Sequence, residues 1–245
     1  MGGYYLNGSI VYGRNSVKEA LKAKRDISEI LISKTAKGVG DILKLAREFD
    51  VLIKFVNPES LKRFNFKTQG VVALCSSIKY TDFKDVQMQI KNSDKAVFIL
   101  ICDKVQDPHN LGALLRTAYA VGADAIILPK RRTAPINSTV EKASAGAVNF
   151  LNIVRVANLA RAINVLKESG VFVYCADGGG RSFYEVDFRG NSALVVGSEG
   201  SGVGKLIKKQ CDVICGVPMV NSIDSLNVSV AGGIIMYEIF RQNIK

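Results

Sequence analysis

Three short polar segments in the second half of the chain carry the residue types that catalysis uses. The first is DPHNLGALLRTA, residues 107–118, in which Asp107, Pro108 and Asn110 are turn and helix-capping residues. The helix that they begin carries Arg116 about two turns further on, and a guanidinium can bind carboxylate or phosphate oxygens through two parallel hydrogen bonds. Taken alone, this segment is most simply an ordinary capped helix with an exposed arginine.

The second segment is VVGSEGSGVGKL, residues 195–206, in which a buried strand runs into a loop with four glycines in eight residues. Glycines after a strand allow the backbone to approach a ligand closely. A Walker A motif does not fit, because Glu199 stands where a glycine is required and Leu206 stands where Ser or Thr is required. A Rossmann fingerprint does not fit either, since only 41 residues follow Gly204.

The third segment is VPMVNSIDSLNVSVAGG, residues 217–233, and its local preferences conflict. Ser225 and Asn227 are polar, Val228 and Val230 are β-branched, and an apolar run follows. Propensity alone allows a strand, a helix or a polar site held inside a core.

The elements around these segments alternate between strand and helix. We predict strands at 96–102, 125–128, 150–156, 171–176, 193–197 and 213–218, with helices at 110–122, 138–146, 158–170 and 203–210. Continuous Val/Ile/Leu strands separated by helices predict a parallel sheet covered on both faces. The fold class is therefore α/β.

The first third of the chain predicts a smaller α/β domain. Its expected strands are 28–32, 51–56 and 70–75, and its expected helices are 15–24, 40–50 and 58–64. We assign this domain to residues 1–80, a polar and charged linker to 81–94, and the larger domain to 95–245.

The net charge of +11 and the pI of about 9.4 indicate a polyanionic partner, of which nucleic acid is the commonest. Residues 1–90 hold 15 basic and 9 acidic residues, and residues 91–245 hold 18 and 13, so the excess is spread over both domains. No zinc finger, basic zipper or aromatic RNP signature is present. On charge alone, a merely soluble basic protein remains an alternative.

Other features exclude several classes of protein. The longest apolar run, 96–102, is seven residues, too short to span a bilayer, and no secretory signal is found, so we expect a cytoplasmic protein. Five cysteines without a CxxC pair predict free thiols in a reducing compartment. His109 is the single histidine, which makes a His-rich metal site or a Ser-His-Asp triad a poor interpretation.

In this order and spacing, the three segments resemble the motifs of the SpoU (TrmH-like) family of RNA ribose 2′-O-methyltransferases, within the SPOUT superfamily. The resemblance covers residues 95–245, and residues 8–80 resemble the RNA-binding domain fused to the ribosomal-RNA members, which is related to a family of ribosomal proteins. Asn221 stands where the third motif usually has Gly, and we expect the local shape to be kept. The matching positions are Asn110, Gly112 and Arg116, then Gly197, Glu199, Gly200 and Gly202, then Pro218, Ser225, Leu226, Asn227 and Val228.

The resemblance implies a fold that periodicity could not show. In SPOUT proteins the C-terminal segment passes through a loop to form a deep trefoil knot, and the knot region contributes to a homodimer interface. Ser225 would then lie at a loop-to-helix junction, where it could cap the helix. From Val228 onward the chain would form a helix buried on most sides.

The resemblance also implies the cofactor, S-adenosylmethionine, with no metal. Backbone at Gly197, Val217 and Leu226 would hold its adenosyl part. Arg116 would have the central catalytic role, and a grip on the RNA phosphate beside the reacting ribose suits it better than proton abstraction, because guanidinium is almost never deprotonated. The residues expected to orient Arg116, the ribose and the loop are Asn110, Glu199, Ser225 and Asn227. Nothing in the family motif requires His109.

The implied activity is methyl transfer to the ribose 2′-OH of a nucleotide, guanosine by preference, in large-subunit ribosomal RNA. Transfer RNA is the main competing substrate, and the separate N-terminal domain favours ribosomal RNA. A non-catalytic RNA-binding protein would also fit the charge. It would not need Arg116, Glu199, Ser225 and Asn227 together.

Overall fold

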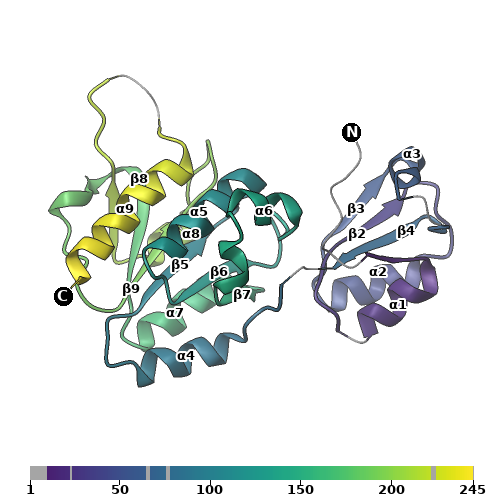
Figure 1. Cartoon of the computed structure of the whole chain (residues 1–245), viewed down its shortest axis with the longest axis horizontal. Helices are drawn as coiled ribbons and strands as arrows, with labels where there is room; N and C mark the ends of the chain where they lie inside the picture. Colours follow the sequence, from purple (N-terminus) through teal and green to yellow (C-terminus); the bar gives the residue numbers. More distant parts are fainter. Residues whose placement is uncertain (1–9, 23, 65–66, 76–77, 222–224, 245) are drawn as a thin grey trace. The chain divides into compact units, whose positions relative to one another are not determined.

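The computed structural model describes residues 10–22, 24–64, 67–75, 78–221 and 225–244. The chain divides into two compact units, one made of residues 1–79 with 135–139 and one made of residues 80–134 with 140–245. Each unit is built around its own β-sheet (Figure 1).

The first unit has a four-stranded mixed sheet in the order β1-β4-β2-β3. Strand β4 is antiparallel to both β1 and β2, and β3 runs parallel to β2. Three helices complete the described part of the unit. Its elements are β1 (Ile10–Tyr12), α1 (Arg14–Lys22), β2 (Ile27–Ser33), α2 (Gly40–Glu48), β3 (Ile53–Val56), α3 (Pro58–Lys62) and β4 (Val71–Cys75).

Both faces of this first sheet are covered, which explains why β4 is apolar throughout. Successive side chains of a strand point to opposite faces. Val71 and Ala73 pack with buried residues of α1 and α2, whereas Val72 and Leu74 pack with Leu61 of α3. Figure 1 shows α1 and α2 together on one side of the sheet.

The second unit has a six-stranded sheet in the order β10-β8-β9-β5-β6-β7, and every pair of neighbours is parallel. The predicted parallel α/β sheet is confirmed. Its elements are α4 (Phe83–Asn92), β5 (Phe98–Cys102), α5 (Pro108–Ala120), β6 (Ala125–Pro129), α6 (Ser138–Ala143), η1 (Ala147–Phe150), β7 (Ile153–Val156), α7 (Leu159–Glu168), β8 (Phe172–Ser182), η2 (Phe183–Glu185), β9 (Ser192–Val196), α8 (Lys205–Gln210), β10 (Val213–Gly216) and α9 (Val228–Asn243).

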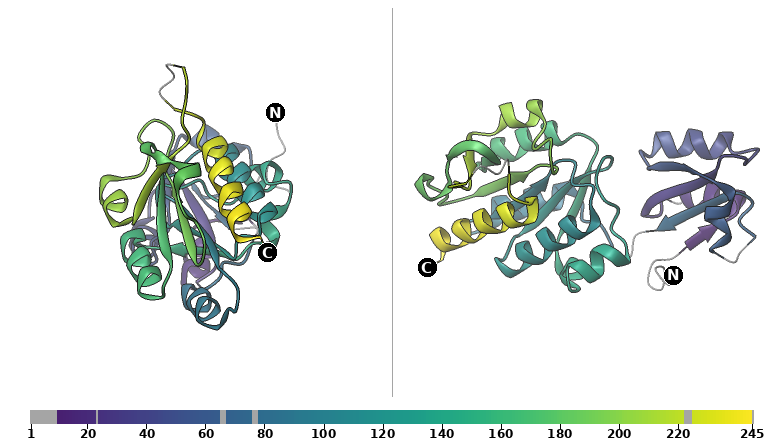
Figure 2. Two further views of the ribbon diagram at one scale, coloured as in Figure 1. Left: turned by 90° about the vertical axis from the view of Figure 1, so that its left-hand side faces the viewer. Right: turned by 90° about the horizontal axis from the view of Figure 1, so that it is seen from above.

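Helices cover both faces of this sheet (Figure 2). Buried residues of α4, α7 and α8 form one cluster with Ile99, Ile101, Ala193 and Val195 of the central strands. On the other face α9 packs beside α5, and a side chain placed at Gly232 of α9 would meet Leu114 of α5 and Val196 of β9. Because successive side chains of each strand point to opposite faces of the sheet, the core is divided into two layers.

The segment that we expected to be a linker, residues 81–94, is instead mostly helical. It contains α4, which Asp82 caps by accepting a hydrogen bond from Lys84 N–H. Val86 and Ile90 of α4 are 1% and 4% exposed and belong to the core of the second unit. The polar residues of this segment form the outer face of an amphipathic helix. Their polarity, which suggested a connector, is that of a helix surface exposed to solvent.

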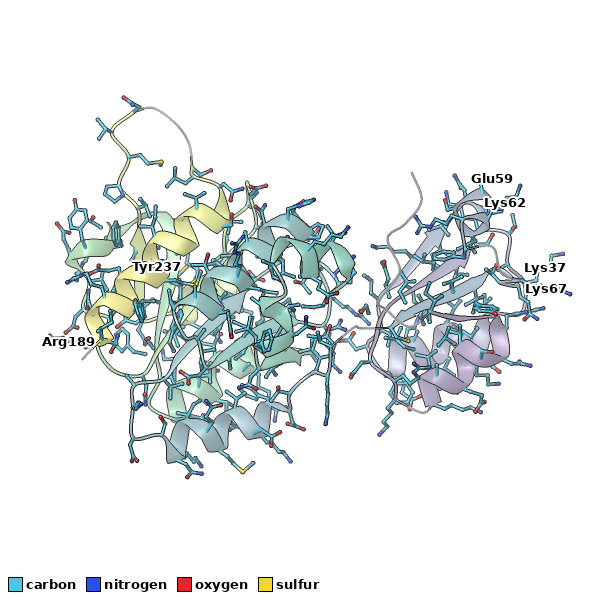
Figure 3. All side chains as sticks on the ribbon, viewed as in Figure 1. Lys37, Glu59, Lys62, Lys67, Arg189 and Tyr237 are labelled. Atoms are coloured by element: carbon cyan, nitrogen blue, oxygen red, sulfur yellow. The ribbon has the colours of Figure 1, made fainter. Side chains whose placement is uncertain are left out.

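The third polar segment ends as a helix, since α9 begins at Val228 as the resemblance implied. Its N-cap is Asn227 rather than Ser225, because the Asn227 side chain accepts the Ser229 N–H at 2.9 Å. Most sides of this helix are buried or half-buried, as the resemblance implied, and Val230, Tyr237 and Phe240 are exposed along one face. Figure 3 shows Tyr237 on this helix.

Candidate active site

A cavity of about 330 Å³ lies at the carboxyl ends of β9 and β10 and beside the middle of their neighbour β8. Ala176 of β8, Gly197 after β9 and Gly216 of β10 all line it. Ala231 and Ile235, from the first turns of α9, line it as well. The carboxyl ends of parallel strands are the usual place for a ligand in an open α/β sheet.

The glycine-rich loop that forms one wall is a tight hairpin. Ser198 and Gly202 exchange two backbone hydrogen bonds, of 3.1 and 3.0 Å, and the hydroxyls of Ser198 and Ser201 lie 2.6 Å apart. Gly200 and Gly202 have positive φ values of 82° and 60°, which glycine adopts without strain. Glu199 stands at the corner of this hairpin and is exposed.

Gly197 is required by close packing of the backbone. A Cβ at this position would lie 2.1 Å from the carbonyl carbon of Gly202 and 2.2 Å from the nitrogen of Val203. The first motif contains a glycine of the same kind, because a Cβ at Gly112 would lie 2.4 Å from the Cβ of Ala143 in α6. These two glycines therefore set how closely chain segments approach one another.

A buried carboxylate holds the far end of the loop. Asp103 follows β5, is only 4% exposed, and accepts the Gly204 N–H at 2.7 Å. Gly204 precedes α8. The hydrogen bond thus joins the end of β5 to the start of α8, the helix that follows the loop.

Asn227 joins three separate segments of the candidate site. Its side-chain amide donates to Oδ1 of Asn110 at 2.9 Å and to Oε1 of Glu199 at 2.5 Å. Its carbonyl oxygen accepts the Ser229 N–H and lies 2.6 Å from the Ser229 hydroxyl. Asn110 is itself fixed in the first turn of α5, where its N–H donates to Asp107. One side chain from each of the three polar segments meets here.

The structure brings most of the expected site residues to one place. The three residues expected to hold the adenosyl group, Gly197, Val217 and Leu226, line the 330 Å³ cavity together with Ser225 and Glu199. A second cavity of about 340 Å³ shares residues with the first, and Asn110 lines it beside Lys104. Residues shared by both cavities are Ser198, Glu199 and Val228.

Arg116 is not part of the Asn227 network. It is exposed on α5, and in the described part of the chain its guanidinium has no hydrogen-bond or ion-pair partner. His109 is exposed in the first turn of the same helix. Asn221 is exposed and its φ is not positive, so no glycine is needed at that position.

Sequence reasoning missed the wall formed by the middle of β8, where the register against β10 shifts. Asp177, Gly178 and Gly179 line the 330 Å³ cavity. Lys208 of α8 pairs with Oδ2 of Asp177 at 2.9 Å, and Gly179 N–H donates to Oδ1 at 3.2 Å. Partial burial opposes ionisation of Asp177, but these partners outweigh it, so the pKa of Asp177 lies below its ordinary value. The signal was the run DGGG, residues 177–180, directly after the apolar run 171–176.

A cavity at the carboxyl edge of a parallel sheet, walled by glycine-rich backbone and apolar side chains, is typical of enzymes that bind a nucleoside-containing cofactor. Comparison with known families is more specific. The profile of the SpoU rRNA Methylase family matches residues 97–237, and the profile for RNA 2′-O ribose methyltransferase substrate binding matches residues 10–81. The chain belongs to the SpoU rRNA methylase family and is an RNA methyltransferase.

Individual relatives agree with this assignment. YacO of Bacillus subtilis, assigned to the TrmH family of tRNA/rRNA methyltransferases, is 39% identical over 95% of both chains. The AdoMet-bound rRNA methyltransferase from Sinorhizobium meliloti has the same fold, with a TM-score of 0.63 and 24% identity over 98% of this chain and 89% of that one. The A. aeolicus TrmH/SpoU tRNA-modifying enzyme is 31% identical, with a TM-score of 0.54, over 65% of this chain and 81% of that one.

The cofactor is S-adenosylmethionine, and the residues present fit it. The volume of 330 Å³ is within the range of small-molecule sites, about 300–1,000 Å³. The missing side chain at Gly197 opens the backbone, and Val217, Met219 and Leu226 give an apolar lining. Among the described residues, no group of three or more His, Cys, Asp or Glu side chains is arranged to hold a metal ion.

Proposed function

We propose that this protein transfers a methyl group from S-adenosylmethionine to the ribose 2′-OH of a guanosine in large-subunit ribosomal RNA. S-adenosylmethionine supplies a methyl group already activated on a sulfonium, so the protein must mainly position the ribose and help its hydroxyl lose a proton. The observation that carries the proposal is the meeting of Asn110, Glu199 and Asn227 beside the cofactor cavity.

The proposed roles follow from these positions. Backbone at Gly197, Val217 and Leu226 holds the adenosyl part, and Ser225, exposed beside the cavity, orients the ribose. Asn110, Glu199 and Asn227 fix the edge shared by the two cavities, so the acceptor nucleotide enters from the side of Asn110.

Arg116 grips the phosphate beside the reacting ribose. An exposed guanidinium without a protein partner in the described part of the chain can bind phosphate with two hydrogen bonds. That phosphate then assists proton loss from the 2′-OH. This role does not require Arg116 itself to lose a proton.

The first unit supplies affinity for RNA and favours ribosomal RNA over transfer RNA. Arg14 donates to the carbonyl of Lys37 at 3.0 Å, which fixes the start of α1 against the loop after β2. The side chains of Lys37 and Lys67 both extend outward from this unit (Figure 3). Basic side chains on fixed loops are suited to bind phosphates.

We also propose that the second unit forms a homodimer through the region of its C-terminal knot. Val230, Tyr237 and Phe240 form an exposed apolar stripe on α9, and the neighbouring helix α5 carries the exposed Tyr119. The Tyr119 ring contacts that of Phe150 with centroids 5.7 Å apart, which extends the apolar surface. A second copy would cover such a surface by twofold symmetry. A monomer by light scattering at micromolar concentration, with activity intact, would contradict this.

The protein is proposed to act in the cytoplasm. In the residues that the structure describes, no helix is long and apolar enough to cross a membrane.

The decisive experiment maps 2′-O-methylation in a strain that lacks the gene. We expect one methylguanosine of large-subunit ribosomal RNA to disappear and to return with the intact gene but not with Arg116→Ala. Loss confined to a transfer RNA would contradict the ribosomal assignment. In parallel, purified protein is given radiolabelled S-adenosylmethionine with each RNA, and no transfer to either RNA would contradict the proposed reaction.

A further inference from the structure

The cofactor cavity carries negative charge although the chain as a whole has a net charge of +11. Within the described part of the chain, two charged side chains line the 330 Å³ cavity, Asp177 and Glu199, and both are carboxylates. The other lining residues are glycines, serines and apolar residues. Carboxylates that line a cavity favour a cationic ligand over a neutral one.

Of these two carboxylates, Asp177 is the one held in the wall. It is 24% exposed, and Lys208 and the Gly179 N–H fix its two oxygens at 2.9 and 3.2 Å. A Cβ at Gly202, in the facing loop, would lie 3.7 Å from its Oδ2. Glu199 is exposed and its Oε1 is engaged by Asn227. Asp177 is therefore a fixed negative charge between two walls of the cavity.

The two forms of the cofactor differ in charge, so a fixed carboxylate such as Asp177 interacts with them differently. S-adenosylmethionine has a sulfonium, an ammonium and a carboxylate, so its net charge is positive. S-adenosylhomocysteine, the by-product, has lost the sulfonium charge and is neutral overall. A compact cavity of this volume is roughly 9 Å across, comparable with the Debye length of about 10 Å at 0.1 M salt. A charge in the wall therefore acts on a ligand anywhere inside.

We propose that Asp177 is a specificity-determining residue that raises the affinity for S-adenosylmethionine relative to S-adenosylhomocysteine. Lys208 moderates this effect, because its ammonium partly neutralises the carboxylate that it contacts. The functional consequence is release of the by-product after methyl transfer, since the ligand loses its attraction to the wall when it loses its charge. This inference rests on the cofactor assigned above.

The test measures the dissociation constants of both ligands by isothermal titration calorimetry on the full-length protein. Asp177→Asn keeps the shape of the side chain and an oxygen that can accept the Gly179 N–H. We expect the ratio of the S-adenosylhomocysteine to the S-adenosylmethionine dissociation constant to fall about three- to tenfold, mostly through weaker binding of S-adenosylmethionine. Lys208→Met, which keeps an apolar stem, should raise the ratio.

The matched control is Asp187→Asn, which changes the net charge equally. Asp187 is exposed, pairs with Arg189 at 2.7 Å and does not line the cavity, so the ratio should stay within about twofold of wild type. High salt should reduce the effect of Asp177→Asn on the ratio.

An equal loss of affinity for both ligands in Asp177→Asn would overturn the proposal and make the residue a support for the fold. An unchanged ratio would overturn it as well. Wild-type protein that binds neither ligand would instead contradict the cofactor assignment, and this result is distinct from a change in the ratio.

Discussion

Replacement of Asn227 tests whether one side chain both begins α9 and assembles the site. Its carbonyl oxygen caps the helix, and its amide donates to Asn110 at 2.9 Å and to Glu199 at 2.5 Å. Loss of a helix cap costs about 1 kcal/mol, and each of the two hydrogen bonds contributes about 0.5–1.5 kcal/mol. Asn227→Ala should therefore lower the free energy of unfolding of the second unit by roughly 2–4 kcal/mol.

Asn227→Ser separates the two roles. Serine can cap α9, but it cannot reach both Asn110 and Glu199, so this variant should lose about 1 kcal/mol less stability than Asn227→Ala. Both variants should lose the same large part of the methylation rate at saturating cofactor and RNA, because each removes the same network.

Thermal unfolding followed by circular dichroism measures the stability of these variants, with about 2–4 °C expected per kcal/mol for a unit of this size. Steady-state methyl transfer gives the rate. A normal rate for Asn227→Ser would refute the role of the network in the site. Equal destabilisation by Ser and Ala would refute the capping role.

Three further predictions concern the site and helix α9, whose first turns line it. Arg116→Ala should reduce the saturated methylation rate about 100-fold or more, with cofactor affinity nearly unchanged by calorimetry, and Arg116→Lys should recover only part because ammonium lacks the two-pronged donor geometry. A loss confined to RNA affinity would make Arg116 an ordinary binding residue. Gly197→Ala should abolish cofactor binding, because its Cβ would lie 2.1 Å from the Gly202 backbone. The control Gly40→Ala should bind the cofactor normally, because nothing lies within 4 Å of a Cβ at that position. Normal binding by Gly197→Ala would contradict the packing argument. Hydrogen bonds from Arg241 hold the pKa of Glu238 below its ordinary value, so its contribution to stability is present above the unfolded pKa of about 4.3 and is lost as pH falls through the folded pKa. Glu238→Gln should thus lower the melting temperature at pH 7 but have little effect near pH 3, and an equal effect at both pH values would contradict this.

Strands β2 to β10 could be predicted from sequence because each contains a short apolar run bounded by turn residues, whereas the three-residue strand β1 was not predicted and β8 continues six residues beyond its apolar run. Strands β5 and β9 are buried along their whole length, and such continuous runs are typical of parallel sheets covered on both faces. Helix α4 was missed for the opposite reason. Only Val86 and Ile90 of its ten residues are fully buried, so its apolar stripe is too narrow to separate from a polar linker.

The candidate site residues were chosen by their types, order and resemblance to a known family, but their contacts could not be predicted. Asn110 and Asn227 are separated by 117 residues and meet only because α5 and α9 lie on the same face of the sheet. Asp177 was missed because none of the three polar segments includes the middle of β8, where it lies. Its role depends on Lys208 and the facing loop, and neither contact follows from local sequence.

The helix α4 determines where this protein can be divided. A fragment that starts at residue 95 would lack the side chains of Val86 and Ile90, each of which stabilises the second core by about 1.5–3 kcal/mol. Such a fragment would expose an apolar strip of that core and would be prone to aggregate and to be degraded. Division near residue 79 leaves the helix with the sheet that it covers. The catalytic unit, as a module that could be recombined with other RNA-binding domains, therefore begins before α4.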